Sequence, residues 1–494
     1  MPASDRPARG LLVAGTSSDA GKSLVTAGIC RFLARRGVRV APFKAQNMSN
    51  NSMVCPDGTE IGRAQYLQAQ AAGAVPESAM NPVLLKPGSD RRSFVVVRGR
   101  PAGTLEAGEF ASGRRHLALA AFAAYEELAD RYDVIVCEGA GSPTEINLRA
   151  GDYVNMGLAQ RFCLPVVVVG DIDRGGVFAS LYGTVALLDD ADRALIRGLV
   201  INKFRGDVGL LRPGLDRITS LTGVPVLGVL PWMDDVWLDG EDTLQVGRWG
   251  VPAWGVPATT TRPALRVAAI RFPRLSNVTD LDALAGEPGV EVTMTTDPMS
   301  VRSADLVVLP GSRATVSDLA WLRSTGLADA VARAAVRGAT VLGICGGFQM
   351  LGETICDDVE SGSGEVAGLG LLPVRVAFGA GKVLATPTGR WREHEVLGYE
   401  IHHGIATVDG ARVDEPFLGG GRVGRVWGTM WHGAFENDGF RRSWLEGVAT
   451  VAGHPFVADR AMTGFRARRE AMLDRLADAV AGHLDTEALL DLTA

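Results

Sequence analysis

The sequence predicts an α/β protein in which a parallel-sheet domain with a Gly-rich loop after its first strand precedes a second α/β domain. Short runs of β-branched residues recur through the first half, and helical patterns separate them. These runs lack the polar alternation of half-exposed strands, which indicates a parallel sheet covered by helices on both faces. The 494 residues exceed one ordinary core, and a stretch rich in Gly, Pro and Thr interrupts the pattern at residues 248–263.

The elements of the first domain, residues 1–247, can be placed in order. A strand at 11–14 leads into a helix at 22–36, and a second strand follows at 38–43. An Ala- and Gln-rich segment at 63–75 is predicted to be helical. Because ligands bind at the carboxyl ends of parallel strands, we expect the site at that edge of the sheet. Four more apolar runs complete the sheet, at residues 134–137, 166–169, 199–201 and 226–229.

The second domain is predicted to span residues 264–447. Its clearest strands are the apolar runs at 306–309 and 340–344. A helical tail of mixed charge follows at 448–494. The segment at 248–263 is interpreted as the linker between the two domains.

Composition restricts the class of partner. The net charge is −6, with 47% hydrophobic and 21% charged residues, so we expect neither nucleic acid nor an anionic membrane to be a partner. None of the six cysteines forms a Cys-x-x-Cys pair, which argues against a zinc ribbon or a disulfide framework. No signal-peptide core and no apolar run of membrane-spanning length are found, and we expect a cytoplasmic protein.

The loop after the first strand has the composition of a phosphate-binding loop. It runs from Gly15 through Thr16 to Gly21, Lys22 and Ser23, between a strand and a helix. Its amides are expected to face phosphate oxygens of ATP, with the lysine neutralising charge and the serine hydroxyl reaching Mg²⁺. The first glycine lies one residue earlier than in the common pattern, and the alternative is a Gly-rich turn with an exposed lysine.

Three strand ends support a nucleotide site. Glu138 ends the run at 134–137, and a carboxylate there suits Mg²⁺. Lys44 follows the second strand and is expected to point into the same crevice. Asn202, after the run at 199–201, could contact the adenine edge. The alternatives are a carboxylate in a surface turn, a solvated lysine and an ordinary turn asparagine.

A second kind of chemistry is indicated by Cys345. It follows an apolar strand in a Gly-x-Cys-x-Gly step, the pattern of a strand-to-helix turn that exposes a nucleophile. Such a step suits a protease, an esterase-like enzyme or a glutaminase. Gln349 one turn further along, and a strand-end Gly311 whose amide could form an oxyanion hole with that of Gly346, favour the glutaminase. A buried structural thiol is the alternative.

The base is predicted to be His432, at the end of an apolar strand, since Cys plus His suffices to attack an amide and protonate ammonia. His402 and His403 are rivals that we interpret as structural. These motifs resemble class I glutamine amidotransferases, in which a Glu follows the His by two residues; here position 434 is Ala, and the next acid is Glu436. The resemblance therefore implies a Cys–His pair without a third, acidic member.

These motifs resemble two known groups. The loop and the Glu-Gly-Ala-Gly run at 138–141 resemble dethiobiotin-synthetase-like P-loop enzymes, and the resemblance makes Ser23, Asp57 and Glu138 the Mg²⁺ candidates. The second domain resembles class I glutamine amidotransferases. Longer segments, covering essentially the whole chain, resemble the cobyric acid synthase family, among them residues 42–52, 57–65, 80–87, 138–148 and 171–178.

The resemblance implies a ligase of cobalamin biosynthesis. It would use ATP, Mg²⁺ and L-glutamine to amidate the b, d, e and g carboxylates of adenosylcobyrinic acid a,c-diamide through acyl phosphates. The related a,c-diamide synthases share the two-domain plan but lack the Gln-Asn-Met segment found here at residues 46–48. The oligomeric state is left open.

Several polar residues are candidates for holding the corrinoid polycarboxylate. A local basic cluster around residues 86–100 is expected to face its rim in part, since Arg binds carboxylates in a bidentate manner. A solvated hairpin is the alternative. A P-loop switch ATPase with a degenerate second domain is the competing reading of the whole chain. The substrate candidates are Gln46, Asn47, Lys86, Arg91, Arg92, Asp171, Asp173 and Arg174.

Overall fold

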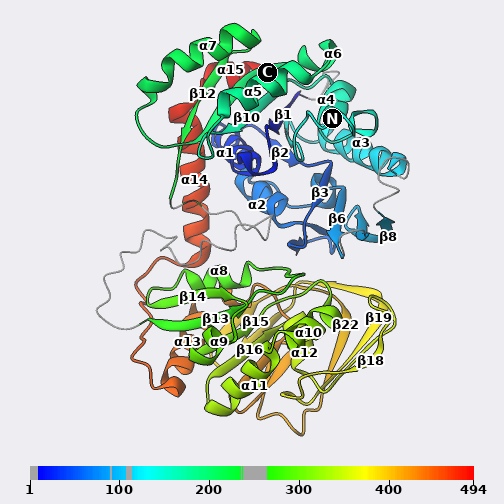
Figure 1. Ribbon diagram of the computed structural model, residues 1–494, viewed down its shortest axis with the longest axis vertical. Coiled ribbons are helices and arrows are strands. Elements are labelled where there is room, and N and C mark those ends of the chain that lie inside the picture. The colour runs from blue at the N-terminus through cyan, green and yellow to red at the C-terminus, as the bar shows by residue number, and fades with distance from the viewer. Residues whose placement is uncertain (1–8, 89–91, 107–113, 235, 237–263, 494) are drawn as a thin grey trace. The chain divides into compact units, whose positions relative to one another are not determined.

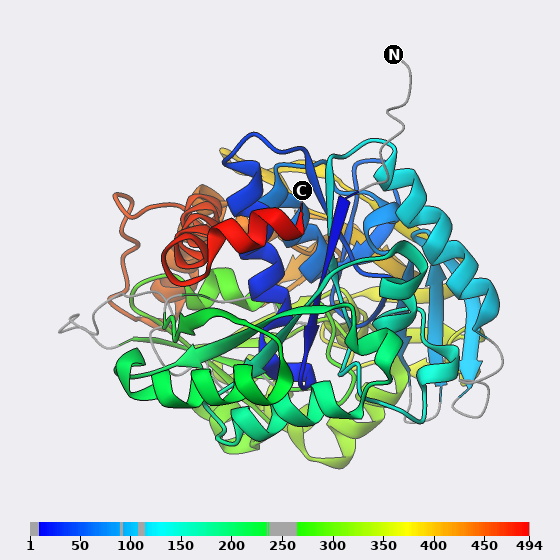
Figure 2. The same cartoon turned by 90° about the horizontal axis from the view of Figure 1, so that it is seen from above.

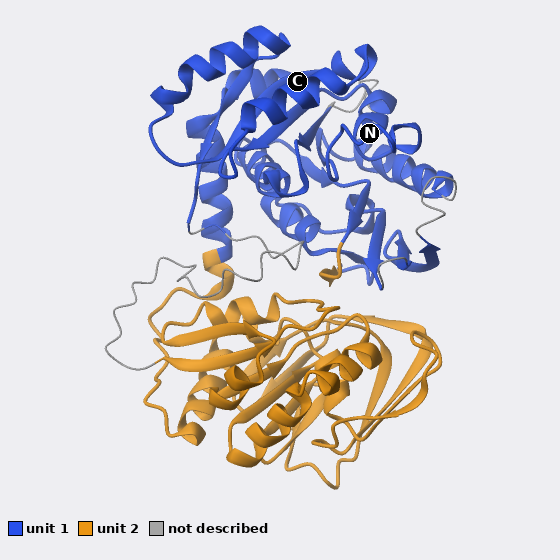
Figure 3. Ribbon diagram, viewed as in Figure 1, with its two compact units in different colours: residues 1–48, 55–238, 469–494 blue, residues 49–54, 239–468 orange. Residues whose placement is uncertain are grey.

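The computed structural model describes residues 9–88, 92–106, 114–234, 236 and 264–493 (Figure 1). The chain divides into two compact units (Figure 3). Unit 1 comprises residues 1–48, 55–238 and 469–494, and unit 2 comprises residues 49–54 and 239–468. The expected linker at 248–263 lies outside the described residues. The expected tail at 448–494 is divided between the two units.

Unit 1 is built on a six-stranded sheet in the order β12-β11-β10-β1-β9-β2. Its first strand, β1, is the dark-blue arrow near the centre of Figure 2. All neighbouring strands in it are parallel, as predicted. The carboxyl ends of all six strands therefore meet at one edge, where a ligand site is expected. The strands are β1 Arg9–Gly15, β2 Val40–Phe43, β9 Val134–Glu138, β10 Val166–Asp171, β11 Ile196–Phe204 and β12 Val226–Pro231.

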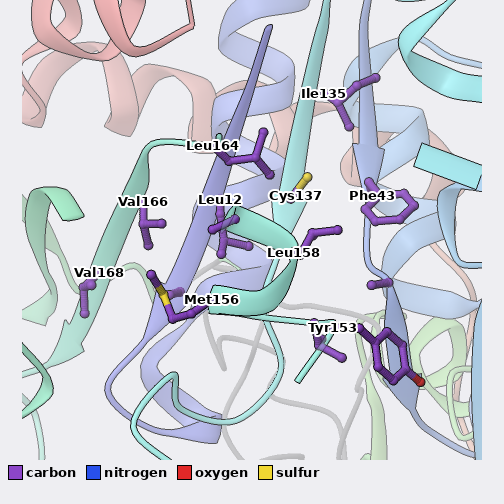
Figure 4. Packing of buried hydrophobic residues seen from close by; sticks show 14 of the residues in the cluster. Leu12, Phe43, Ile135, Cys137, Tyr153, Met156, Leu158, Leu164, Val166 and Val168 are labelled. Carbon is purple, nitrogen blue, oxygen red and sulfur yellow. The ribbon is translucent and has the colours of Figure 1, made fainter. Parts of the chain in front are cut away.

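Both faces of this sheet are buried. Leu12 and Val166 belong to one apolar cluster, shown in Figure 4, whereas their neighbours Leu11 and Val167 belong to another. Successive strand residues point to opposite faces, so two separate clusters mean that helices cover both sides. The helices between these strands are α1 Lys22–Ala34, α2 Arg63–Ala72, α3 Arg115–Ala129, α4 Met156–Phe162, α5 Val177–Leu187, α6 Asp190–Arg193 and α7 Arg212–Thr222.

A small mixed sheet completes this part of unit 1. Its order is β3-β6-β7-β8, with a parallel first pair and antiparallel pairs after it. The basic cluster around residues 86–100 falls on β6 and on the β7–β8 hairpin. The strands are β3 Gln46–Met48, β6 Val83–Pro87, β7 Arg92–Val97 and β8 Arg100–Glu106; the short β5 Glu60–Gly62 precedes α2.

The chain end belongs to unit 1. Helix α14, Phe465–His483, and helix α15, Thr486–Leu492, contribute apolar side chains to the same cluster as Leu11. On α1, a Cβ at Gly28 would lie 3.1 Å from the backbone oxygen of Leu476, so a larger residue there would require α14 to shift slightly. Arg31 of α1 forms an ion pair with Asp474 at 2.8 Å.

We predict that Leu476→Ala destabilises unit 1 by about 2–5 kcal/mol, because Leu476 is only 3% exposed and its removal leaves a cavity. Leu210→Ala is the matched control, since Leu210 lies in the same unit and is 81% exposed. Urea unfolding followed by circular dichroism measures the difference. Equal midpoints for the two variants would show that α14 contributes nothing to this core.

Unit 2 contains a seven-stranded sheet in the order β14-β13-β15-β16-β25-β24-β23. Its first five strands are parallel, and β24 and β23 are antiparallel additions at one edge. The predicted α/β architecture is therefore confirmed for both units. The strands are β13 Leu265–Ile270, β14 Val290–Thr295, β15 Leu306–Leu309, β16 Thr340–Ile344, β23 Glu415–Phe417, β24 Gly420–Val423 and β25 Val426–Thr429.

A second sheet of unit 2 has the order β18-β17-β19-β22. The hairpin β20–β21 lies between β19 and β22 in the sequence. The short strand β4, Ser52–Val54, also belongs to unit 2. None of the described helices combines the length and apolar character that a membrane span requires. The remaining elements are α8 Asp280–Ala285, α9 Pro298–Ser303, α10 Thr315–Ser324, α11 Leu327–Arg337, α12 Gly346–Leu351, α13 Asp438–Ala452, β17 Thr354–Asp357, β18 Gly364–Ala367, β19 Val374–Ala385, β20 Thr388–Trp391, β21 His394–Leu397 and β22 Glu400–Val408.

Candidate functional site

The Gly-rich loop lies between the end of β1 and the start of α1, as predicted. Gly21 has φ of 94°, which favours glycine, and a Cβ there would lie 2.2 Å from the Asn202 side-chain nitrogen. The Lys22 ammonium donates to the backbone oxygens of Ser17 at 2.8 Å, Ser18 at 3.2 Å and Gly141 at 3.0 Å. The lysine is thus folded back over its own loop, where it could bind phosphate oxygens.

A buried carboxylate organises the residues beside the loop. Glu138 is fully buried and accepts hydrogen bonds from Ser23 at 2.7 Å, Lys44 at 2.9 Å and Gln68 at 2.6 Å. The ion pair with Lys44 offsets the free-energy cost of burying the negative charge of Glu138. Ser23, Lys44 and Glu138 are therefore brought together as predicted. Gln68 was missed, because nothing distinguishes it from the other glutamines of its helix.

Ser23 and Glu138 offer adjacent hydroxyl and carboxylate oxygens, the hard ligands that Mg²⁺ prefers. Asp57, the third predicted ligand, occupies an exposed turn, and its carboxylate accepts from the Thr59 amide at 2.9 Å. Among the residues that the structure describes, no group of three or more His, Cys, Asp or Glu side chains is placed to hold a metal ion. A serine, one carboxylate and nucleotide phosphates do not require such a cluster.

The end of β11 holds the loop from the other side. Asn202 donates to the Ala20 backbone oxygen at 3.0 Å, and Lys203 donates to that of Asp19 at 2.6 Å. The backbone amide of Thr16 donates to Val169 of β10 at 2.9 Å. Asn202 therefore supports the loop, whereas contact with a base stays a prediction.

Beyond Asn202 lies a pocket of about 370 Å³ at the ends of β11 and β12. The Arg205 guanidinium stacks over the Trp232 ring at 3.9 Å, which gives the pocket a flat, polarisable wall. His483 of α14 also lines it, so the chain end reaches this pocket. The lining residues are Phe204, Arg205, Gly206, Val208, Val229, Pro231, Trp232, Asp234 and His483.

Three predicted substrate residues lie at the end of β10, next to the loop. Asp171 pairs with Lys203 at 2.6 Å, and Asp173 pairs with Arg205 at 3.5 Å. Arg174 pairs with Asp19 of the loop at 2.6 Å. These side chains connect β10, β11 and the phosphate-binding loop, and their contact with a substrate stays a prediction.

The other substrate candidates of unit 1 are mostly internal. Gln46 is buried and accepts from Tyr153 at 2.5 Å and Arg114 at 3.0 Å. Asn47 is buried and donates to Gln65 at 2.8 Å.

The basic cluster is not one continuous surface. Lys86 is buried in an ion pair with the equally buried Glu60, so it does not belong to an exposed basic face. Arg92 is exposed and pairs with Glu106 at 2.8 Å. Arg91 lies outside the described residues.

In unit 2, Cys345 occupies the predicted strand-to-helix turn between β16 and α12. Its φ of 49° and ψ of −109° place a non-glycine residue in a strained region, as at the nucleophile turn of α/β enzymes. The glycines around it are required by close packing. A Cβ at Gly347 would lie 1.9 Å from the Leu309 backbone oxygen.

The expected oxyanion residues lie around this turn. A Cβ at Gly346 would lie 2.8 Å from the Ser312 amide nitrogen, and one at Gly311 would lie 3.0 Å from a ring carbon of His432. Gln349 is fixed by Thr315 at 3.2 Å and by the Gly404 backbone oxygen at 3.1 Å. The structure thus brings Gly311, Gly346 and His432 together.

His432 has a carboxylate partner that the sequence analysis missed. Its Nδ1 lies 2.6 Å from Asp280 Oδ2, and the second oxygen of Asp280 accepts from the Gly433 amide at 2.6 Å. Both side chains are almost completely buried. The expectation of a Cys–His pair without an acid is therefore wrong, because the acid comes from α8, 152 positions earlier, instead of from the segment after His432.

The carboxylate changes the acidity of the imidazole. Burial alone would lower the pKa of His432, but Asp280 and the Cys345 side chain outweigh burial and raise it to about 10. His432 also stacks on Tyr399, with ring centroids 5.3 Å apart. By contrast, burial, with a smaller contribution from His432, lowers the pKa of His402 to about 4. This lowered pKa keeps His402 neutral at physiological pH.

Comparison with known proteins assigns a family to each part of the chain. Residues 11–246 match the CobQ/CobB/MinD/ParA nucleotide binding domain family, and residues 266–440 match the CobB/CobQ-like glutamine amidotransferase domain family. Fold and sites thus define an enzyme of the glutamine amidotransferase class that carries a nucleotide-binding domain.

Relatives that align with nearly the full length of the chain show which family within this class it belongs to. The chain is 62% identical over 487 residues to the cobyric acid synthase of Cutibacterium acnes, covering 98% of this chain and 99% of that protein. It is 59% identical over 490 residues to that of Mycolicibacterium gilvum, covering 98% and 96%. The chain belongs to the cobyric acid synthase family. A solved glutamine amidotransferase aligns with 38% of this chain and 98% of its own at 18% identity and a TM-score of 0.31, which adds nothing to the assignment.

Proposed function

We propose that this enzyme converts adenosylcobyrinic acid a,c-diamide to adenosylcobyric acid by amidating its b, d, e and g carboxylates with ATP and L-glutamine. The proposal is carried by one observation. A single chain of this family holds a buried Cys345–His432–Asp280 arrangement in one unit and a phosphate-binding loop with Lys22, Ser23 and Glu138 in the other. Its place is in cobalamin biosynthesis, and its cytoplasmic location stays a prediction.

The first reaction releases ammonia. The Cys345 sulfur attacks the glutamine side-chain amide after its proton passes to His432, and the amide hydrogens of Gly346 and Gly311 stabilise the tetrahedral oxyanion. The imidazolium then donates its proton to the departing nitrogen, which leaves ammonia and a thioester. Water hydrolyses the thioester to glutamate. Asp280 keeps the imidazole oriented through Nδ1 and stabilises its charge.

The second reaction activates a corrinoid carboxylate. One carboxylate oxygen attacks the γ-phosphorus of ATP, ADP leaves, and Lys22 and Lys44 neutralise the charge on the transferred group. Mg²⁺, held by Ser23 and Glu138, would supply further charge neutralisation. Ammonia then attacks the acyl phosphate carbon, inorganic phosphate leaves, and the amide remains. The pocket with Arg205 and Trp232 has a suitable wall and volume for the nucleobase.

Mass spectrometry tests the proposed function directly. The protein is incubated with the corrinoid a,c-diamide, ATP, Mg²⁺ and glutamine, and the corrinoid is followed over time. We expect four successive replacements of a carboxylic acid by an amide. An enzyme of the diamide-forming type would instead accept the fully acidic corrinoid and stop after two replacements. No amidation of either corrinoid would refute the proposal.

A further inference from the structure

One short segment of the first domain's sequence belongs structurally to the glutaminase unit. Residues 46–48 form β3 of unit 1, residues 49–54 belong to unit 2, and unit 1 resumes at Cys55 (Figure 3). We call residues 49–54 the crossing segment. Ser49, Asn51 and Ser52 within it are 3%, 3% and 0% exposed. Buried polar residues are usually held by specific hydrogen bonds. The hydrogen-bond partners of these residues therefore show which part of unit 2 the crossing segment stabilises.

Asn51 binds the turn that precedes Asp280. Its side-chain oxygen accepts from the Val278 amide at 3.2 Å, while the Ser52 amide donates to the Asn277 side-chain oxygen at 3.0 Å. Each of the two segments therefore donates one backbone amide hydrogen, and each accepts one with an asparagine side-chain oxygen. The pair fixes the crossing segment against the turn in a single register.

These two hydrogen bonds stabilise an unusual backbone conformation in the turn before Asp280. Asn277 has φ of 50° and is 4% exposed, and its backbone oxygen accepts from the Asp280 amide at 3.3 Å. The turn is tied at its other end by the Ser276 amide, which donates to Gly311 at 3.0 Å. Because α8 begins at Asp280, the direction of its carboxylate depends on this turn.

The crossing segment also supports the other side of His432. Val54 packs in a small apolar cluster with Tyr399 and Ile401. Tyr399 stacks on the His432 ring, and the two residues exchange both backbone hydrogen bonds at 2.9 Å. The segment therefore contacts both structures that orient the imidazole, namely the turn before Asp280 and the Tyr399 side chain.

We propose that Asn51 is a positioning residue of the glutaminase centre. The inference rests on the proposed glutaminase role of Cys345 and His432. Asn51 acts through the turn before α8, because its side-chain oxygen holds the Val278 amide two positions before Asp280.

The test uses the full-length protein with Asn51→Ala, which removes the acceptor for Val278, and Asn51→Asp, which retains an oxygen there. For Asn51→Ala we expect the kcat of glutamine hydrolysis to fall at least about tenfold while KM for glutamine changes little, because orientation and not binding is lost. Asn51→Asp should recover most of the rate.

Two further variants control for folding. Asp297→Ala removes a side chain that caps the start of α9 in the same unit, and it should leave hydrolysis unchanged. Asn277→Gly suits the positive φ but removes the acceptor for Ser52, so it should keep the fold and lower kcat in the same way. The inference is overturned if Asn51→Ala and Asn277→Gly both hydrolyse glutamine within about twofold of the wild-type rate. Glutamine hydrolysis that survives in Cys345→Ala would instead refute the proposed function itself.

Discussion

Replacing Cys345 by Ala is expected to abolish glutamine-supported amidation while ammonia-supported amidation persists. In the proposed mechanism the Cys345 sulfur attacks the glutamine amide, and loss of a covalent nucleophile costs about 10⁴-fold or more in other enzymes that form acyl intermediates. The phosphate-binding loop and Glu138 lie in the other unit and are untouched by the change. Amide formation is measured in parallel with glutamine and with a high concentration of ammonium salt at mildly alkaline pH.

The matched control is Cys356→Ala. Cys356 is also a free thiol of unit 2, but it is exposed on β17. This variant should use glutamine and ammonia at wild-type rates. If Cys345→Ala loses both activities and retains its fold, the two units do not carry separate reactions. If it loses neither, the strained turn at residue 345 has a structural role.

Local sequence patterns were sufficient to locate the two loops of the candidate sites. The nucleotide loop requires glycine at position 21, and the Cys345 turn requires small residues on both sides, since side chains there would collide with backbone atoms. Such steric requirements can be recognised in the sequence, because the required glycines lie within a few positions of the candidate site residue. The same is true of the buried strands, whose apolar runs predicted the parallel sheet of unit 1 and two of the parallel strands of unit 2, β15 and β16.

Contacts between distant segments could not be predicted in this way. Asp280 is an ordinary acid at the start of a short helix, and only the fold brings it to His432. Lys86 belonged to a locally basic stretch in the sequence, yet its partner Glu60 comes from a different strand. The tail was expected to be helical, but the helical pattern did not indicate which unit would bury it.

Asp280→Asn is expected to lower the kcat of glutamine hydrolysis by about 10²–10⁴-fold, as for an orienting carboxylate elsewhere. Asparagine retains the shape of the side chain, but its amide nitrogen can donate to Nδ1 and stabilise the wrong imidazole tautomer. The pKa of His432 should fall from about 10, because Asp280 is the main favourable partner of the imidazolium. The kcat is measured by glutamate release across pH, and the pKa by NMR.

The change should also alter stability in a pH-dependent way. In the wild type the pKa of His432 is raised above the unfolded value of about 6.5, so this stabilisation is complete below that pH. It is lost as the pH rises through about 10. The stability advantage of the wild type over Asp280→Asn should therefore be larger at pH 6 than at pH 9, as measured by urea unfolding.

The variant Glu436→Gln tests whether Glu436 or Asp280 is the carboxylate that orients the His432 imidazole. Glu436 is the nearest acid after His432 in the sequence and lies in the short helical turn Ala434–Glu436, whereas Asp280 is the acid in contact with Nδ1. If contact determines catalysis, Asp280→Asn is the severe variant, and Glu436→Gln keeps the wild-type pH profile of kcat. The reverse order would mean that the carboxylate moves away from Nδ1 during turnover. Rates of both variants at pH 6 and pH 9 separate these outcomes, because only the true partner sets the pKa of the imidazole.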